Sequence, residues 1–222
     1  MSISMKIIRH INRLFSSNTY ILFIDTQKGF WVIDPGDFHF IKNWAQKSNK
    51  SLTGILLTHS HFDHIYGIDH LLETYPDASL YASIHAKAGL CSQKINGSKY
   101  QENPFTIKNC DIKSIKEGDS IELWDNLKAG AIETPGHGRD CITYKIGMNL
   151  FTGDSLIPGV KVFTKMQYGD KFQADNSIER ILSQNSDKAI IWPGHRDACT
   201  LAVIKREYVI LQKGKSLVVD HL

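Results

Sequence analysis

The segment Thr58-His59-Ser60-His61-Phe62-Asp63-His64 is the most informative part of this chain. It follows the apolar run Gly54-Ile55-Leu56-Leu57, which is short and aliphatic and therefore predicts a buried strand that ends at Thr58. Three imidazoles and one carboxylate then occur within six positions. Where a strand ends the chain can turn, so neighbouring side chains can converge instead of alternating across a sheet. Histidine and aspartate together suit zinc or a similar transition metal, so this segment predicts a metal site.

Three further turns each present a histidine or an aspartate next to a glycine, directly after an apolar run. They are Thr134-Pro135-Gly136-His137-Gly138, Thr152-Gly153-Asp154 and Pro193-Gly194-His195. A glycine at such a place lets the backbone approach closely and frees the direction of the neighbouring side chain. One such turn would carry little weight, but three of them together with the first segment favour one shared metal site.

Length and composition are those of an ordinary globular protein. The chain has 222 residues, 42% hydrophobic and 22% charged, and we expect one domain over residues 1–222. The net charge of +3 is too small to indicate nucleic-acid binding, and no apolar run is long enough to span a membrane. Residues 1–10 lack a signal-peptide pattern, and the absence of a Cys-x-x-Cys pair favours reduced thiols. We therefore expect a cytoplasmic protein with a small-molecule substrate and neither nucleic acid nor membrane as partner. A homodimer is left open.

The apolar pattern predicts strands in two groups with helices outside them. We expect strands at 5–10, 18–24, 29–33, 54–58, 80–83, 111–115, 120–124, 127–133, 142–146, 150–152 and 189–192. We expect helices at 38–48, from just after His64 to Pro76, around 178–182 and at 201–211. The polar stretch 92–104 is expected to be a mobile loop over the site. These elements predict one four-layered αββα sandwich of the α/β class.

In these residues the chain resembles the metallo-β-lactamase-fold hydrolases. That superfamily has a His-x-His-x-Asp-His segment followed in order by a histidine, a bridging aspartate and a last histidine. The resemblance covers nearly the whole chain, from Asp34-Pro35-Gly36 to Pro193-Gly194-His195. It implies a binuclear site with this division of ligands: His59, His61 and His137 for the first metal, Asp63, His64 and His195 for the second, and Asp154 as the bridge.

The resemblance also implies the chemistry of the site. The cofactor would be two divalent metal ions, preferably zinc, with iron or manganese as alternatives. Two such ions about 3.5–4 Å apart can lower the pKa of a shared water to about 7, so that hydroxide attacks a carbonyl carbon. The catalytic residues would be Asp154, as the bridge, and Asp63, which could orient the nucleophile through a hydrogen bond.

Within the superfamily, Thr134-Pro135-Gly136-His137 before Gly153-Asp154-Ser155 is most similar to the glyoxalase II, or hydroxyacylglutathione hydrolase, group. This similarity implies hydrolysis of a thioester such as an acylglutathione. The sequence departs from the group after His137, where Gly138-Arg139-Asp140-Cys141 replaces the usual Thr-x-Gly-Ser. The chain also ends 27 residues after His195, where longer enzymes of the group carry a helical extension that binds glutathione.

Three rival interpretations remain open. In a mononuclear iron persulfide dioxygenase of the same superfamily, His59, His137 and Asp154 would form a two-histidine, one-carboxylate face. A phosphodiesterase or lactonase could use the same binuclear site. A non-catalytic zinc module is disfavoured, because structural zinc sites normally have four protein ligands and favour cysteine. Metal analysis and oxygen uptake distinguish the first rival from a hydrolase.

A few other residues are candidates for supporting roles. Asp34 either orders a ligand loop or a ligand histidine, or simply forms a turn before Pro35. Five cations near the ligand turns either hold an anionic substrate tail or are solvated charges: Arg139, Lys161, Lys165, Lys171 and Arg196. Tyr144 and Tyr168 are candidates for the pocket, and Cys141 reads as a small buried residue.

Overall fold

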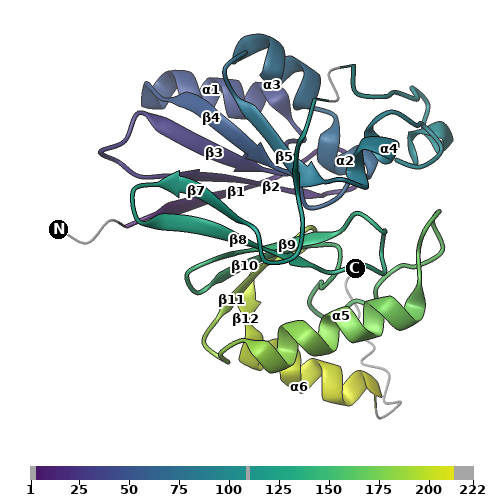
Figure 1. Cartoon of the computed structure of the whole chain (residues 1–222). Helices are drawn as coiled ribbons and strands as arrows, with labels where there is room; N and C mark the ends of the chain where they lie inside the picture. Colours follow the sequence, from purple (N-terminus) through teal and green to yellow (C-terminus); the bar gives the residue numbers. More distant parts are fainter. Residues whose placement is uncertain (1–3, 109–110, 213–222) are drawn as a thin grey trace.

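The computed structural model describes residues 4–108 and 111–212 and contains two six-stranded sheets that face each other (Figure 1). The first sheet has the order β1 (Lys6–Ile11), β2 (Asn18–Phe23), β3 (Gly29–Ile33), β4 (Ser51–Leu56), β5 (Ser79–Ser83) and β6 (Lys113–Ile115). The second has the order β12 (Cys199–Thr200), β11 (Ile190–Pro193), β10 (Asn149–Gly153), β9 (Ile142–Ile146), β8 (Leu127–Glu133) and β7 (Ser120–Trp124). Both sheets are mixed, with parallel pairing from β3 to β6 and between β10 and β11.

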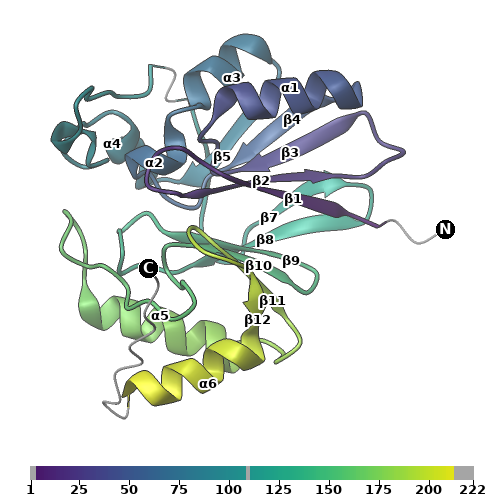
Figure 2. The same cartoon turned by 180° about the vertical axis from the view of Figure 1, so that it is seen from behind.

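Helices cover the outer face of each sheet (Figures 1 and 2). The first sheet carries α1 (Phe38–Ser48) and α3 (Ile68–Thr74), and the second carries α5 (Lys171–Gln184) and α6 (Leu201–Gln212). Three short helices, α2 (Phe62–Ile65), α4 (Ala86–Leu90) and the 3-10 helix η1 (Ser98–Tyr100), lie between the strands β4 and β6 in the sequence. The layers therefore run helix, sheet, sheet, helix, which confirms the αββα sandwich predicted from the sequence.

Alternation along the strands explains why both faces of each sheet are buried. In β3, Trp31 and Ile33 belong to the apolar cluster between the sheets, whereas Phe30 and Val32 pack under α1 and α3. Successive side chains of a strand point to opposite faces, so one apolar strand can contribute to two cores. A third cluster, which includes Ile181, lies between the second sheet and its helices. These cores fix the two sheets against each other and hold the ends of their strands in place.

The structure changes several sequence-based boundaries. The helix expected after His64 is two helices, because α2 already begins at Phe62 and a break follows at Gly67. The amide of Gly67 donates to the carbonyl of Pro35, and a Cβ there would collide with the backbone of Gly36. The strand expected at 111–115 is reduced to Lys113–Ile115, and the two-residue β12 was not predicted.

The stretch 92–104 is attached to the metal segment through its backbone. The carbonyl of Asn96 accepts a hydrogen bond from the amide of Phe62, and the Asn96 side chain donates to the carbonyl of Phe105. Asn96 and Ser98 are buried. The prediction of an irregular loop is therefore incomplete, because this stretch contains η1 and supports the start of α2.

Two other expectations concern features outside the site. In the described part of the chain no helix combines the length and the apolar character that a membrane span requires. Cys141 and Cys199 are free thiols, Cys91 is exposed, and Cys110 lies outside the described residues. That residues 1–222 constitute one domain stays a prediction.

Candidate metal centre

Strand direction brings the four predicted ligand segments to one edge of the sandwich. β4 is parallel to β3, so the residues after both strands leave the first sheet at the same end. In the second sheet β8 and β10 run in the same direction, since each is antiparallel to β9, and β11 is parallel to β10. The carboxyl ends of strands that run in the same direction share one edge of a sheet, where ligand sites commonly form. His137, Asp154 and His195 therefore leave the second sheet together.

Backbone contacts join the two sheets at this edge. The amide of Asn18 donates to the carbonyl of Gly194 at 2.6 Å, and Ser17 forms an isolated β-bridge with His195. The hydroxyl of Ser17 also donates to the carbonyl of Asp63 at 2.7 Å. The hairpin between β1 and β2 thus holds the segment of His195 against α2, although His195 and α2 are more than a hundred residues apart in the sequence.

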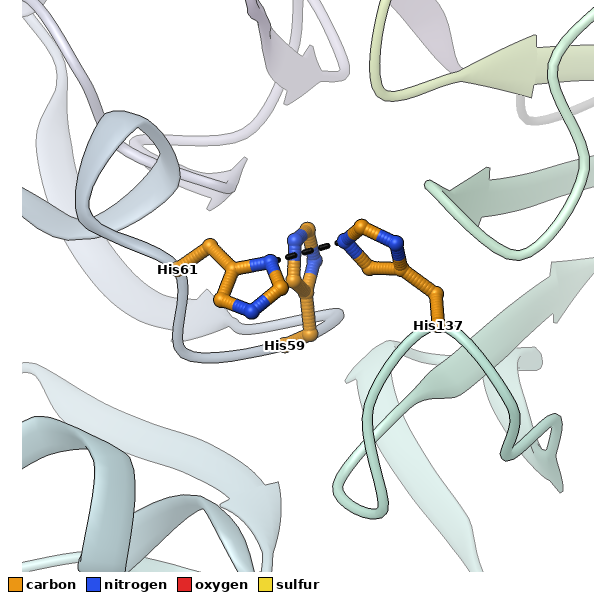
Figure 3. A group of neighbouring side chains, drawn as sticks. All are labelled: His59, His61 and His137. Carbon is orange, nitrogen blue, oxygen red and sulfur yellow. Dashed lines mark hydrogen bonds between the residues drawn. The ribbon is translucent and has the colours of Figure 1, made fainter. Parts of the chain in front are cut away.

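Three histidines from two sheets converge in the first group. One ring nitrogen each of His59, His61 and His137 lies within 4.8 Å of the others, and Figure 3 shows His59 and His61 reaching across to His137. Nδ1 of His61 is 2.7 Å from Nε2 of His137, and the two rings are nearly perpendicular. Three imidazole nitrogens at this spacing form a set that a zinc ion or a similar cation can bind.

Asp63, His64 and His195 form a second group with the same 4.8 Å limit. Oδ2 of Asp63 lies 3.3 Å from Nε2 of His195 and 3.4 Å from Nε2 of His64. Asp63 and His64 come from the first sheet through α2, which turns both side chains inward from adjacent positions. The three residues that the resemblance assigns to the second metal thus lie together, and their role as its ligands stays a prediction.

Asp154 lies between the two groups. Its Oδ2 is 3.5 Å from Nε2 of His137 and 3.5 Å from Nε2 of His195, while its Oδ1 is 3.6 Å from Nε2 of His64. The turn that carries it is tight, since Gly153 has a φ of 50° and packs against the Thr58 side chain. One carboxylate thus faces members of both groups, and all seven predicted ligands meet at one place.

Asp34 positions residues of both groups through hydrogen bonds. It is buried, and its carboxylate accepts from the amide of Thr58 at 2.8 Å, from the hydroxyl of Thr58 at 2.6 Å and from Nδ1 of His64 at 3.1 Å. Because the Thr58 hydroxyl proton points to Asp34, its oxygen accepts from Nδ1 of His59 at 3.0 Å. His59 then carries its proton on Nδ1 and presents the lone pair of Nε2 to the site, and His64 would do the same once a cation displaces the proton on its Nε2.

His137 is oriented in the same way by a backbone group. Its Nδ1 lies 2.7 Å from the carbonyl oxygen of Phe163, which can only accept, so Nδ1 carries the proton and Nε2 the lone pair. Nothing in the sequence marks this contact, because any residue supplies a carbonyl. A second unpredicted contact is that of Asp140, whose Oδ2 accepts from the amide of Ser60 at 2.8 Å and ties the His137 turn to the first segment.

Electrostatics keep His59 and His61 neutral. Burial, reinforced by His64, lowers the pKa of His59 well below its usual value. Burial together with the neighbouring His137 lowers the pKa of His61 to about 4. Both rings are therefore uncharged near neutral pH, which is the form that binds a metal ion.

The second group balances two carboxylates with two imidazoliums. Burial alone would lower the pKa of His64 and His195, but Asp63 and Asp154 outweigh it and raise these pKa values to about 9 and about 10. In return the two histidines lower the pKa of both carboxyls against the opposing effect of burial. A cation that binds these atoms displaces the imidazolium protons, so its affinity rises with pH.

The pattern of unpaired atoms fits a divalent cation. Nε2 of His59, Nε2 of His64 and Oδ1 of Asp154 are buried and have no hydrogen-bond partner among the described residues. A buried polar atom without a partner costs about 1–3 kcal/mol, so three in one cluster call for a common partner. Imidazole nitrogen and carboxylate oxygen are the donor types that zinc accepts.

Two of the supporting candidates lie in the interior. Tyr144 is fully buried between the sheets and donates its hydroxyl to the carbonyl of Leu57 at 3.0 Å, so the prediction of a pocket role was wrong. The sequence of β9 does not show which of its side chains point into the layer between the two sheets, so it could not place Tyr144 there. Cys141 is a buried thiol whose pKa burial raises, which agrees with the prediction of a small buried residue.

Comparison with known proteins gives a consistent result. Residues 13–195 match the family model described as the metallo-beta-lactamase superfamily. Hydroxyacylglutathione hydrolase 1 of Vibrio vulnificus (strain YJ016) is 33% identical over 211 residues, which cover 95% of this chain and 74% of the relative. Hydroxyacylglutathione hydrolase of Buchnera aphidicola subsp. Baizongia pistaciae (strain Bp) is 30% identical and is matched over 82% of this chain and 63% of its own length. The chain thus spans roughly two thirds to three quarters of these two relatives.

The fold has a counterpart among solved structures. The BLEG-1 B3 metallo-beta-lactamase superposes with a TM-score of 0.82 at 24% sequence identity, over 89% of this chain and 95% of the other. At this level of identity the match concerns the arrangement of the sheets and helices.

Proposed function

The chain belongs to the metallo-beta-lactamase superfamily, and on this premise we propose that it is a metal-dependent hydrolase with a binuclear centre that cleaves thioesters such as acylglutathiones. The relatives named hydroxyacylglutathione hydrolase support the thioester as substrate. Two of the three groups of donor atoms share no residue and support the count of two ions, with His59, His61 and His137 for one and Asp63, His64 and His195 for the other. The third group, Asp34, His59 and His64, overlaps both, and its Asp34 carboxylate is taken up by hydrogen bonds to Thr58 and His64.

The observation that carries the proposal is the position of Asp154. Its Oδ2 is equally far, 3.5 Å, from Nε2 of His137 in one group and from Nε2 of His195 in the other. A carboxylate in that position suits a bridge between two cations. A mononuclear site would leave either Asp63 or His61 without a metal to bind, although each has a donor atom within 4.8 Å of those of the two other residues in its group.

The reaction needs little from the protein besides placement. Two divalent ions, when bound, supply a water with a pKa near 7 and polarise the carbonyl of the substrate. Asp63, besides being a ligand, would accept a hydrogen bond from the attacking water and so orient it. The Asp34 and Thr58 hydrogen bonds keep the rings of His64 and His59 in the orientation that binding requires. A thiol has a pKa of about 8.5, so the thiolate can leave without a proton from a general acid. This suits the site, because all seven residues would be occupied as metal ligands.

Metal quantification tests the count of ions. We expect about two equivalents of zinc, iron or manganese per chain after purification without added metal. His195→Ala should remove one equivalent, and His59→Ala or Asp154→Ala should abolish turnover. His70→Ala is the matched control, because His70 is exposed on α3 and lies outside both groups. Two full equivalents or normal turnover in the Asp154→Ala protein would refute the bridge.

A panel of thioester, lactone and phosphodiester substrates tests the reaction. We expect the thioester to have the highest kcat/KM of the three. One iron per chain together with oxygen uptake on a glutathione persulfide would instead establish the dioxygenase interpretation, and preference for a phosphodiester would replace the thioester in the proposal.

A further inference from the structure

A cavity of about 150 Å³ lies directly beside the candidate metal centre. His61, one of the predicted ligands, forms part of its wall together with Ser60. The rest of the wall comes from four other segments: the start of α4, Ile95 in the stretch after α4, the turn after His137 and the turn before α5. A group bound in this cavity would therefore lie next to whatever reacts at the metals.

Polar side chains in the wall are free to bind a ligand. Arg139, His85, Gln167 and Tyr168 line the cavity, and in the described part of the chain none of their side chains makes an ion pair or a hydrogen bond. Asp140 also lines the cavity, and its Oδ2 accepts from the amide of Ser60; among the described residues no ion pair joins it to Arg139. Arg139 therefore keeps its full hydrogen-bonding capacity at the edge of the site.

The other cations near the ligand turns are placed elsewhere. Lys161, Lys165 and Lys171 line a different cavity of about 630 Å³, between α5, α6 and the segment before α5, and none of the seven predicted ligands lines it. Arg196 is directed at the backbone, with its guanidinium on the carbonyl of Pro158. Of the five cations that the sequence suggests for an anionic tail, Arg139 is the one beside His61.

Resting on the proposed thioesterase function, we propose that this cavity binds a carboxylate on the non-reacting part of the substrate and that Arg139 determines this specificity. A guanidinium pairs with a carboxylate through two parallel hydrogen bonds, whereas Gln167 and Tyr168 can each donate one. The volume of about 150 Å³ suits a short carboxylate arm. The preferred substrates are thus thioesters that carry a free carboxylate.

The test compares substrates that differ only in this charge. S-lactoylglutathione and its diethyl ester, in which both carboxylates are blocked, are hydrolysed by the wild type, Arg139→Gln and Arg139→Lys. We expect Arg139→Gln to lower kcat/KM for the acid roughly 10- to 100-fold, the range of a charge-assisted hydrogen bond, and to leave the diester nearly unchanged. Arg139→Lys should recover part of the preference. Arg206→Gln on the exposed face of α6 is the control and should behave as wild type.

A binding measurement separates this inference from the proposed function. S-methylglutathione and its diethyl ester contain no thioester, so calorimetric titration reports the carboxylate contact without turnover. Metal content is measured in parallel and should be equal in all four proteins. If the wild type binds S-methylglutathione through Arg139 but hydrolyses no thioester, the function fails and the carboxylate site stands. Equal binding of acid and diester by the wild type, or a preference for the acid that Arg139→Gln retains, overturns the carboxylate site.

Discussion

Oδ2 of Asp34 lies 3.1 Å from Nδ1 of His64, and Asp34 holds this position with a left-handed backbone, at a φ of 51°. Left-handed conformations are uncommon outside glycine, although aspartate and asparagine adopt them more readily than most residues. The backbone strain therefore coincides with a residue whose side chain orients a predicted ligand. It places the carboxylate between β3 and β4, where it accepts three hydrogen bonds at once.

Asp34→Asn should weaken metal binding without a large change in the backbone. Asparagine tolerates the positive φ, but its amide group would turn a donor toward Thr58 or His64, which are donors themselves. We expect a loss of roughly 10- to 100-fold in metal affinity, the usual effect of removing a partner of a ligand histidine. Competition with a chelator measures it. Asp25→Asn removes an exposed ion pair with Lys6 and should have no effect. Wild-type affinity in Asp34→Asn would exclude this role.

Gly194→Ala should disturb the centre through a steric collision. A Cβ at this position would overlap Oδ1 of Asp154 and lie 2.9 Å from Cε1 of His64. Because Asp154 must move, we expect less metal per chain and a fall in thioester turnover of roughly 100-fold, which is typical of a displaced catalytic group. Gly147→Ala is the matched control. Gly147 has a φ of 59° with open space around it, so this variant should lose about 1 kcal/mol of stability and retain its metal. Full metal content in Gly194→Ala would contradict the prediction.

Tyr144→Phe should destabilise the fold and spare the metal centre. The variant removes the hydroxyl that bonds to the carbonyl of Leu57 in the buried layer between the sheets. The carbonyl would lose that partner, so we expect the free energy of unfolding to fall by about 1–3 kcal/mol in urea titration. KM for the thioester should not change. A raised KM at unchanged stability would show instead that Tyr144 contacts the substrate.

Asp37 should stabilise the protein in a pH-dependent manner. Burial tends to raise its pKa, but hydrogen bonds from Tyr66, His10 and Arg13 outweigh burial and lower the pKa to about 2 from 3.8. Because the folded value is below the unfolded one, the stabilisation is complete above about pH 4 and is lost as the pH falls toward about 2. It should amount to about 2 kcal/mol.

The measurement is urea unfolding of chelator-treated protein between about pH 5 and pH 2.5, for the wild type and Asp37→Asn. Removal of metal excludes release of bound metal at low pH, and the protonation of the predicted ligands is common to both proteins and cancels in their difference. The difference in unfolding free energy between the two proteins should shrink as the pH falls. A difference that is constant over this range would show that the carboxylate of Asp37 has no share in acid stability.

Much of the architecture could be predicted because the relevant signals are local. Apolar runs such as the one before Thr58 specify strands, and the short turns with glycine specify where chain direction can change. The order of the four ligand turns indicated the metallo-beta-lactamase superfamily, and the superfamily predicted the αββα layers. For Asp34 the sequence left two roles open, support of a ligand and a simple turn before Pro35, and the hydrogen bonds from Thr58 and His64 favour the first.

Other features depend on contacts between segments distant in the sequence. The Phe163 carbonyl that orients His137, the depth of Tyr144 and the separation of Arg139 from the three lysines all follow from how the sheets and α5 pack. The sequence gives the chemical identity of each side chain, so the set of metal-binding donor residues could be predicted from it. Only the tertiary structure decides the distances across the sandwich, the burial of each side chain and the position of each proton. The reason is that desolvation and the approach of charged groups from distant segments occur only when the chain has packed.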